Sequence, residues 1–293
     1  MIKRLAVLAF FVLAAGSAQA KTLHVVASFT ILGDLVRQIG GEHVVVTTLV
    51  GPEGDAHVYE PTPNDVRTMA AADLVVINGL HMEGWIERLI KASSTKAPVV
   101  VASKGIKTRA MVEDRKTVTD PHGWQDVANG ITYGANIADG LVAADPEDGD
   151  YFRARTESYL AALADLDRWV RAQIALIPAE KRRVITSHDA FGYFGRAYGV
   201  TFLAPQGIST EAEAKPAELG KLIRQVRQTH VKAIFLENMS DPRLVEELAR
   251  ESGAVVGGTL YVDALSAENG PAASYIQMFQ HNVPMLVEAM LKN

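Results

Sequence analysis

Residues 148–177 read DGDYFRARTESYLAALADLDRWVRAQIALI, and this stretch decides how the rest of the chain is arranged. Its apolar side chains recur at steps of three and four residues, the spacing of one face of an α-helix, and charged residues fill the gaps. Pro178 closes the pattern. The stretch therefore predicts one amphipathic helix of about 28 residues, ~42 Å long, which is suited to be a stiff connector between two lobes.

Short runs rich in β-branched residues alternate with helical stretches on both sides of this helix, and such alternation indicates parallel sheets. The strand-like runs are 23–28, 44–50, 74–78, 99–102, 183–186, 200–203, 231–236 and 255–261. We expect an α/β fold of two lobes, each a mostly parallel sheet flanked by helices, joined by one long rigid helix. The expected division is a signal peptide at 1–20, an N-terminal lobe at 21–147, the connecting helix at 148–177 and a C-terminal lobe at 178–293.

The first twenty residues have the pattern of a secretory signal. Lys3 and Arg4 precede an apolar run that is too short to cross ~30 Å of hydrocarbon, and Ala18-Gln19-Ala20 resembles a cleavage site. The chain contains no cysteine, which excludes disulfides, thiolate metal sites and a lipid attached to a cysteine. We expect a protein that is secreted to the periplasm through a cleaved signal peptide and is not lipid-anchored.

The charge of the chain argues against some classes of partner. The formal net charge is −5, and removal of Lys3 and Arg4 with the signal leaves −7. A modestly acidic chain without basic runs is a poor candidate for binding nucleic acid or anionic membranes. We expect no nucleic-acid partner and a monomeric protein.

Four polar side chains are expected at the edge where parallel α/β folds build their sites: one in a loop after a strand, one in a loop ahead of a helix, one where a strand opens into a helix and one after a strand-like run. They are His57, His122, His188 and Asp263, all far apart in the sequence. Imidazole suits zinc, and a carboxylate completes a four-coordinate site without thiols. On the residues alone, a shared metal site competes with three separate loop histidines and a capping aspartate. The other five histidines are expected to be structural or solvated.

Four motifs in this order resemble the metal-specific solute-binding proteins of ABC transporters, whose lobes are joined by one rigid helix. The motifs are GDAHVYEP at 54–61, DPHGW at 120–124, TSHDAFGYF at 186–194 and GTLYVD at 258–263. The resemblance covers essentially the whole chain after the signal. It implies that His57 and His122 from the first lobe and His188 and Asp263 from the second bind one divalent metal ion. It also implies delivery to the membrane ABC permease of an importer, with no enzymatic activity.

The resemblance leaves the metal open between zinc and manganese or iron. In this family a glutamate at the position of His188 goes with manganese or iron, whereas a histidine there tends to go with zinc. A third imidazole also moves a site from hard oxygen towards borderline nitrogen donors. The stretch 107–119 lacks the histidine-rich loop of many zinc members. We expect Zn²⁺, with Mn²⁺ as the alternative.

Two rivals of another class stay open at this point. Three histidines with an open position could serve a secreted zinc hydrolase, and Glu237 is the residue that could act as its base. The chain has no His-Glu-x-x-His motif, and a fourth ligand at Asp263 would close the site. The second rival is a binder of a larger metal chelate or of a host surface. In a metal-binding protein, Glu237 would instead hydrogen-bond a ligand histidine, while Trp124 and Tyr261 would shield the site.

Overall fold

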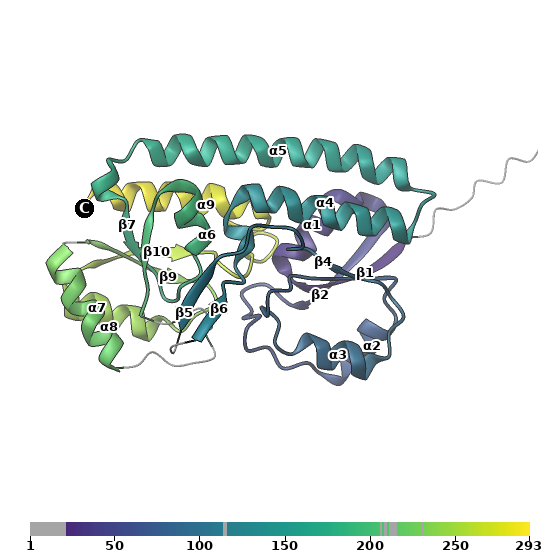
Figure 1. Ribbon diagram of the computed structural model, residues 1–293, viewed down its shortest axis with the longest axis horizontal. Coiled ribbons are helices and arrows are strands. Elements are labelled where there is room, and N and C mark those ends of the chain that lie inside the picture. The colour runs from purple at the N-terminus through teal and green to yellow at the C-terminus, as the bar shows by residue number, and fades with distance from the viewer. Residues whose placement is uncertain (1–21, 114–115, 206, 208–209, 211–215, 230) are drawn as a thin grey trace, which may run out of the picture.

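The computed structural model describes residues 22–113, 116–205, 207, 210, 216–229 and 231–293. The predicted signal segment at 1–20 lies outside these residues. Within them, no helix is both long and apolar enough to span a membrane. Two separate groups of strands and helices lie at opposite ends of an elongated molecule, below one long helix (Figure 1).

The first lobe is built on a four-stranded parallel sheet with the order β2-β1-β3-β4. β1 is almost entirely buried, as expected of a central strand that is covered on both faces. The strands of this sheet are β1 (Leu23–Phe29), β2 (Val44–Val50), β3 (Leu74–Ile77) and β4 (Val99–Val101). Its first helices are α1 (Thr30–Gly40), the short η1 (Gly41–His43), α2 (Pro63–Ala70) and α3 (Ile86–Ser93).

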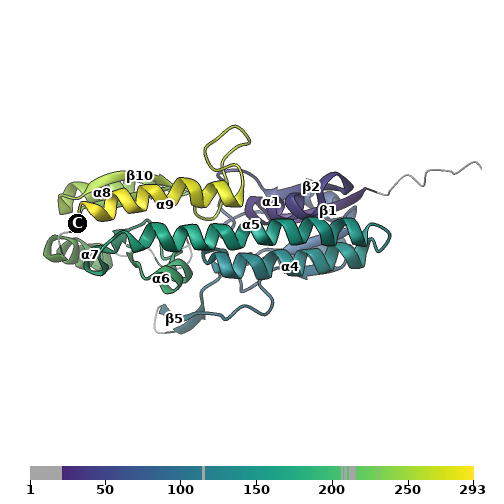
Figure 2. The ribbon, with the colours of Figure 1, turned by 90° about the horizontal axis from the view of Figure 1, so that it is seen from above.

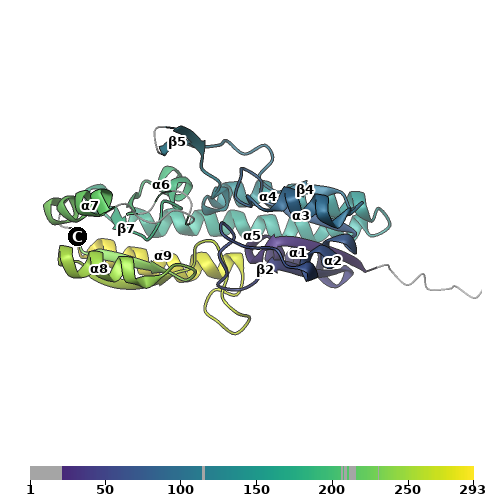
Figure 3. The same cartoon turned by 90° about the horizontal axis from the view of Figure 1, so that it is seen from below.

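The second lobe repeats this plan with the parallel order β10-β9-β7-β8. Its strands are β7 (Arg183–Ile185), β8 (Thr201–Leu203), β9 (Ala233–Glu237) and β10 (Val255–Leu260). Its helices are η3 (Ala179–Lys181), α6 (Gly192–Tyr198), α7 (Pro216–Thr229) and α8 (Pro242–Ser252). A β-hairpin of β5 (Ala110–Glu113) and β6 (Lys116–Thr119), which the strand pattern did not predict, projects from the body beside α6 (Figures 2 and 3).

The long helix α5 (Gly149–Ala175) joins the two lobes and is packed along most of its length. It lies beside α4 (Val127–Ala144) over the first lobe and beside α9 (Tyr275–Leu291) over the second (Figures 1 and 2). One stripe of α5 is buried, formed by Phe152, Tyr159, Leu163, Leu166, Val170 and Ile174. These residues belong to an apolar core that continues from the first sheet to side chains of the second lobe. The packing makes α5 part of the core, which accounts for a stiff connection.

This architecture confirms the expected fold class of two parallel-sheet lobes joined by one long helix. The physical basis is the periodicity of residues 148–177, since a stripe of apolar residues over seven turns must be covered along its whole length. The exact limits of the lobes, at 21–147 and 178–293, remain a proposal.

Candidate metal centre

The four side chains that the sequence singled out meet in one place. One ligand atom from each of His57, His122, His188 and Asp263 lies within 4.8 Å of the others. Each follows a strand end or a loop near one, at the edge where the carboxyl ends of parallel strands converge. His57 and His122 come from segments of the first lobe, and His188 and Asp263 come from segments of the second. The cluster is therefore assembled only when both lobes are folded and joined.

The distances within the cluster suit four donors around one small cation. The Nε2 atom of His122 lies 3.2 Å from Nε2 of His57 and 3.4 Å from Nε2 of His188. Oδ2 of Asp263 lies 3.3 Å from Nε2 of His57 and 3.2 Å from Nε2 of His188. Donors held about 2.0–2.1 Å from a tetrahedral ion are about 3.3–3.4 Å apart, which these four spacings match, whereas the whole set of ligand atoms spans up to 4.8 Å.

The cluster is shielded from solvent. The side chains of His122, His188 and Asp263 are fully buried, and that of His57 is 4% exposed. Both carboxylate oxygens of Asp263 are buried and accept no hydrogen bond of normal geometry from the described residues. A buried carboxylate without hydrogen bonds is costly unless a positive charge compensates it. Among the described residues the three imidazoles are its immediate neighbours, and a cation that they share with Asp263 would supply that charge.

Charges within the cluster, acting against burial, set its protonation. Burial opposes ionisation of Asp263, but the positive potential of His122 and His188 outweighs it and holds the pKa of the carboxyl well below its usual range. Burial also disfavours a charged His188, yet the carboxylates of Glu237 and Asp263 raise its pKa well above the usual value. The carboxylate is thus ready as an anionic donor, whereas a metal ion must displace a proton from His188.

Two further carboxylates orient the buried imidazoles. Oδ1 of Asp120 lies 2.8 Å from Nδ1 of His122 and also accepts the His122 backbone N–H at 3.0 Å. Glu237, at the end of β9, makes a short hydrogen bond to Nδ1 of His188. A carboxylate at Nδ1 leaves Nε2 as the donor toward the centre of the cluster. Among the described residues, Nδ1 of His57 has no such carboxylate partner.

Asp120 is a functional residue that the sequence reasoning missed, although it stands in the DPHGW motif. Arg109 donates from Nη1 to Oδ2 of Asp120 at 2.8 Å. Burial opposes the charge of Asp120, while hydrogen bonds and the potential of His122 lower its pKa below the ordinary value. The available signal was an acidic residue two positions before a candidate ligand, a spacing that lets one carboxylate reach both the backbone N–H and the ring.

The structure places Glu237 and Trp124 as expected and Tyr261 elsewhere. Glu237 contacts His188, so the hydrogen bond to a ligand histidine is present. The Trp124 ring packs edge-on against His122 at 5.4 Å, and its Nε1 donates to the Val262 carbonyl at 3.0 Å. The ring of Tyr261 instead packs edge-on against that of His281, outside the cluster.

Two of the remaining histidines have other side-chain partners, and His81 is exposed. Nδ1 of His43 lies 2.5 Å from Oδ2 of Asp148, and the ring stacks on Tyr151. His281 contacts the Thr259 carbonyl at 3.0 Å, and His24 is exposed on β1. His230 lies outside the described residues.

Comparisons with known proteins point to one family. The family described as "Zinc-uptake complex component A periplasmic" matches residues 25–289. The manganese-binding lipoprotein MntA of Halalkalibacterium halodurans is 34% identical over 268 residues, which are 92% of this chain and 88% of that protein. The iron-binding protein YfeA of Yersinia pestis is 31% identical over 270 residues, covering 92% and 86% of the two chains.

Solved structures similar to this chain are also those of metal-binding proteins. The periplasmic zinc-binding protein TroA from Treponema pallidum has a TM-score of 0.87 at 32% identity and covers 92% of this chain and 99% of its own. A manganese-bound periplasmic metal-binding protein from Candidatus Liberibacter asiaticus has a TM-score of 0.81 at 29% identity, with the same coverage.

These relatives correct the expectation about localisation. We expected a protein without a lipid anchor, but several relatives, including MntA of H. halodurans and SloC of Streptococcus mutans, are named lipoproteins. The expectation rested on one absence, that of cysteine, which concerns only an anchor attached through a thiol. The expectation is contradicted and is withdrawn.

Proposed function

Because the chain belongs to the family of the periplasmic zinc-uptake component A, the metal-binding solute-binding proteins of ABC transporters, we propose that it captures Zn²⁺ for an importer. The proposed ligands are His57, His122, His188 and Asp263. As a solute-binding component of a transporter the chain is not an enzyme, which excludes the zinc-hydrolase alternative. The proposed role is delivery of the bound ion to the membrane permease of the same importer.

The convergence of three Nε2 atoms and one carboxylate supports the ligand set and the choice of zinc. Four of their six separations, at 3.2–3.4 Å, are those of donors around a four-coordinate ion. The donor set of three imidazoles and one oxygen suits a borderline cation better than a hard one. With all four positions filled by protein atoms, the ion has no open position for catalysis, which suits cargo rather than cofactor.

Manganese is the second candidate, and one feature of Asp263 favours it. Both oxygens of this carboxylate are free of normal hydrogen bonds with the described residues, and Oδ1 lies 3.8 Å from Nε2 of His122. Bidentate coordination would add a fifth donor, and Mn²⁺ prefers more oxygen and a higher coordination number than Zn²⁺. MntA of H. halodurans is named as manganese-binding and YfeA of Y. pestis as iron-binding, and neither name supports zinc over manganese.

Capture and release follow from the chemistry of the donors. Neutral imidazoles and an ionised Asp263 replace the water shell of the ion, so acidification weakens binding by protonating the imidazoles. The donors come from both lobes, and release therefore requires that the two sets of donors separate or that one donor withdraws. Since α5 is packed along its length, a small rotation of the lobes or a shift of the His57 loop is a better fit than a wide hinge motion.

Competition calorimetry tests the proposal. The metal-free protein is titrated with Zn²⁺, with Mn²⁺, and with Zn²⁺ in the presence of excess Mn²⁺. His57→Ala, His122→Ala and His188→Ala are each expected to weaken Zn²⁺ binding by at least a hundredfold, since each removes one of four donors. His24→Ala is the matched control, because His24 is exposed on β1 away from the cluster.

The outcomes separate the ligand set from the choice of metal. Parent-like affinity in all three variants would contradict the ligand assignment. If the variants lose binding and the parent binds Mn²⁺ more tightly than Zn²⁺, the ligand assignment holds and the preferred metal is manganese instead of zinc. His188→Glu sharpens this result, because a carboxylate in place of the third imidazole should shift preference from Zn²⁺ toward Mn²⁺.

A further inference from the structure

The carboxylate of Asp263 is not oriented by hydrogen bonds of its own. Both of its oxygens are buried and lack a hydrogen-bond partner among the described residues, whereas the rings of His122 and His188 are each held by a carboxylate. The position of the Asp263 carboxylate therefore depends on the main chain on either side of it. That main chain, residues 261–265, directly follows β10 and is held by side chains of both lobes.

Two side chains from the first lobe hold the carbonyl that precedes Asp263. Nε1 of Trp124 and Nε2 of Gln125 both donate to the Val262 carbonyl at 3.0 Å, and both side chains are buried. The two donors stand two and three residues after His122, and their acceptor belongs to the residue before Asp263. This pair of hydrogen bonds, the Val262 clamp, therefore connects a ligand segment of one lobe with a ligand segment of the other.

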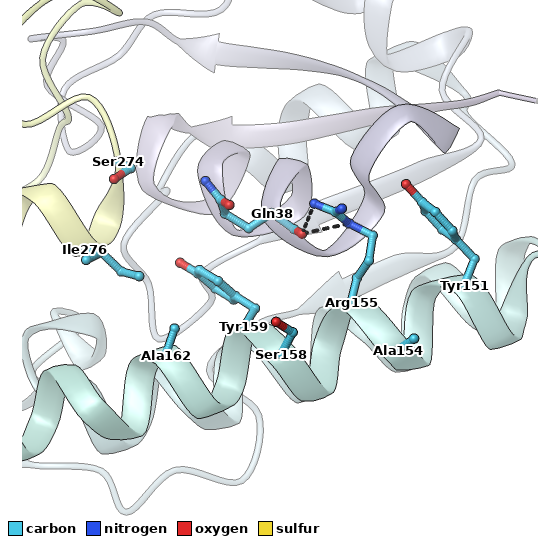
Figure 4. A pocket seen from close by; sticks show the side chains of 9 residues that line it. All are labelled: Gln38, Tyr151, Ala154, Arg155, Ser158, Tyr159, Ala162, Ser274 and Ile276. Carbon is cyan, nitrogen blue, oxygen red and sulfur yellow. Dashed lines mark hydrogen bonds between the residues drawn. The ribbon is translucent and has the colours of Figure 1, made fainter.

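The first lobe also holds the main chain after Asp263. Oγ1 of Thr30, at the start of α1, accepts the Leu265 backbone N–H at 2.9 Å. Helix α1 is in turn attached to the connecting helix α5, since Nε and Nη2 of Arg155 donate to the Gln38 carbonyl at 3.1 and 2.7 Å (Figure 4). The chain on this side of Asp263 is thus fixed to the first lobe and, through it, to α5.

The second lobe holds the same main chain from the other side. The side chain of Asn282, on α9, accepts the Tyr261 backbone N–H at 3.0 Å and donates to the Tyr261 carbonyl at 2.6 Å. Oδ1 of Asn238 accepts the Val262 backbone N–H at 3.3 Å. Without the Val262 clamp the segment keeps these attachments to the second lobe but loses its tie to the first lobe next to Asp263, so Asp263 can shift relative to the first-lobe imidazoles.

The two oxygens of Asp263 stand at unequal distances from the imidazoles. Oδ2 lies 3.3 Å from Nε2 of His57 and 3.2 Å from Nε2 of His188. Oδ1 lies 3.8 Å from Nε2 of His122. Oδ2 is thus at the spacing of a fourth tetrahedral donor, while Oδ1 is further from its neighbour. A main chain that could shift would let both oxygens approach the ion, and this favours a metal with a higher coordination number.

We propose that Gln125, together with Trp124, is a positioning residue that favours Zn²⁺ over Mn²⁺ by holding Asp263 as a one-oxygen donor. Neither side chain supplies a ligand atom, and both act through the Val262 carbonyl. The inference rests on the proposed function, since it requires the four proposed ligands to bind one ion. It adds a specificity-determining role for two residues that come after a ligand histidine in the sequence.

Gln125→Met tests the clamp, because it keeps the length of the side chain and removes the amide donor. Competition calorimetry on the metal-free full chain should show Zn²⁺ affinity falling about tenfold and Mn²⁺ affinity falling by less than about threefold. The ratio of the two affinities should therefore fall at least about threefold. Co²⁺ gives a spectroscopic signature, because its visible absorption weakens when a four-coordinate site becomes five-coordinate, and the Co²⁺-loaded variant should show this weakening.

Two further variants keep the test specific to the clamp. Trp124→Phe removes the other donor to the same carbonyl and keeps an aromatic ring, so it should shift the affinity ratio in the same direction even if Gln125→Met does not fold. Asn136→Leu is the matched control. Nδ2 of Asn136 donates to the Ala102 and Lys104 carbonyls at 2.7 and 2.8 Å, away from the ligand segments, so this variant should lower the melting temperature and leave the affinity ratio unchanged.

The outcomes distinguish this inference from the proposed function. A parent-like affinity ratio and Co²⁺ spectrum in Gln125→Met and Trp124→Phe would overturn the role of the clamp and leave the proposed function in place. An equal shift of the ratio in Asn136→Leu would also overturn it, because a loss of stability alone would then explain the effect. If the parent binds neither Zn²⁺ nor Mn²⁺, the proposed function fails and this inference fails with it.

Discussion

The two lobes support their fully buried imidazoles in different ways. In the first lobe, Asp120 reaches His122 from two residues earlier in the same loop, and Arg109 at the base of the β5–β6 hairpin balances its charge. In the second lobe, Glu237 reaches His188 from the neighbouring strand, and both side chains are fully buried. Asp120 is close to His122 in the sequence and pairs with a partly exposed arginine. Glu237 is far from His188 in the sequence and is enclosed by the protein.

Glu237, the enclosed support, makes more hydrogen bonds to the local backbone than Asp120 does. Oε1 of Glu237 accepts the backbone N–H groups of Ser187 and His188 at 2.9 and 3.1 Å, while Oε2 contacts the His188 ring. One carboxylate thus satisfies three buried donors at the end of β7. In the first lobe, Asp120 accepts one buried backbone N–H, that of His122, besides its contacts with the His122 ring and with Arg109. From this difference we expect the loss of Glu237 to lower both the stability of the fold and the affinity for metal. The loss of Asp120 should lower mainly the affinity for metal.

Glu237→Ala is expected to have the largest effect. It leaves two backbone N–H groups and an imidazole nitrogen buried without an acceptor, at a cost of about 3–5 kcal/mol in the free energy of unfolding. The affinity for Zn²⁺ should fall by about 10–100-fold, since His188 loses the partner that orients it. Chemical denaturation of the metal-free protein and competition calorimetry measure the two effects.

Glu237→Gln separates the two roles of this carboxylate. An amide oxygen can still accept the backbone N–H groups, but the amide nitrogen then faces Nδ1 of His188 and favours the tautomer that places a proton on Nε2. The stability should therefore be largely retained while the Zn²⁺ affinity falls. If Glu237→Gln binds Zn²⁺ like the parent, the carboxylate does not set the tautomer.

Asp120→Ala is expected to have the next largest effect, concentrated in metal affinity. His122 loses the acceptor at Nδ1, and the affinity for Zn²⁺ should fall about tenfold. The unfolding free energy should change less than in Glu237→Ala, because Asp120 lies in a loop and is not a shared acceptor for a strand end. Equal losses of stability in the two variants would remove the distinction between the lobes.

Arg109→Gln should have a small effect. The guanidinium is 29% exposed and its interaction with Asp120 is partly screened, so the expected loss of Zn²⁺ affinity is about two- to fivefold. The salt dependence distinguishes an electrostatic role from a packing role. If the role is electrostatic, the difference in Zn²⁺ affinity between parent and variant should shrink at 1 M NaCl, where exposed charges are screened within about 3 Å. A difference that does not respond to salt would assign Arg109 a packing role.

The fold and the proposed metal ligands differ in how far the sequence predicts them. The period of residues 148–177 and the alternation of strands and helices required only local patterns, and these are reproduced in α5 and the two sheets. The residues alone gave His57, His122, His188 and Asp263 as candidates, in loops and at strand ends. Their assignment to one site came from the resemblance, because no local rule determines how two lobes face each other.

The supports of the ligands were harder to predict, for physical reasons. Arg109 meets Asp120 only because a β-hairpin forms between them, and the stretch 107–119 carries no strong strand pattern. The hydrogen bond of Glu237 depends on β9 lying beside β7, a non-local pairing. Asp120 was within reach of local reasoning, since it stands two residues before His122.

The helix starts of the two lobes offer the last and smallest comparison, in which the more buried carboxylate lies in the first lobe. At the start of α2, Asp65 accepts the Thr62 backbone N–H at 2.6 Å and the Tyr59 hydroxyl at 2.8 Å, and burial with the Asp65 carboxylate raises the pKa of Tyr59 to about 12. Burial opposes the charge of Asp65, but these hydrogen bonds lower its pKa. At the start of α8, the carboxylate of the exposed Asp241 accepts the Arg243 backbone N–H at 2.9 Å.

Asp65→Ala should lower the unfolding free energy by about 1 kcal/mol at pH 7. Because the folded pKa of Asp65 lies below the unfolded value near 3.8, its charge stabilises the fold above that pH, and the benefit disappears as the pH falls through the folded pKa. The difference in melting temperature between parent and Asp65→Ala should therefore narrow below pH 4. Asp241→Ala should cost less, since water can replace an exposed cap. A larger loss from Asp241 than from Asp65 would show that burial does not govern the strength of these caps.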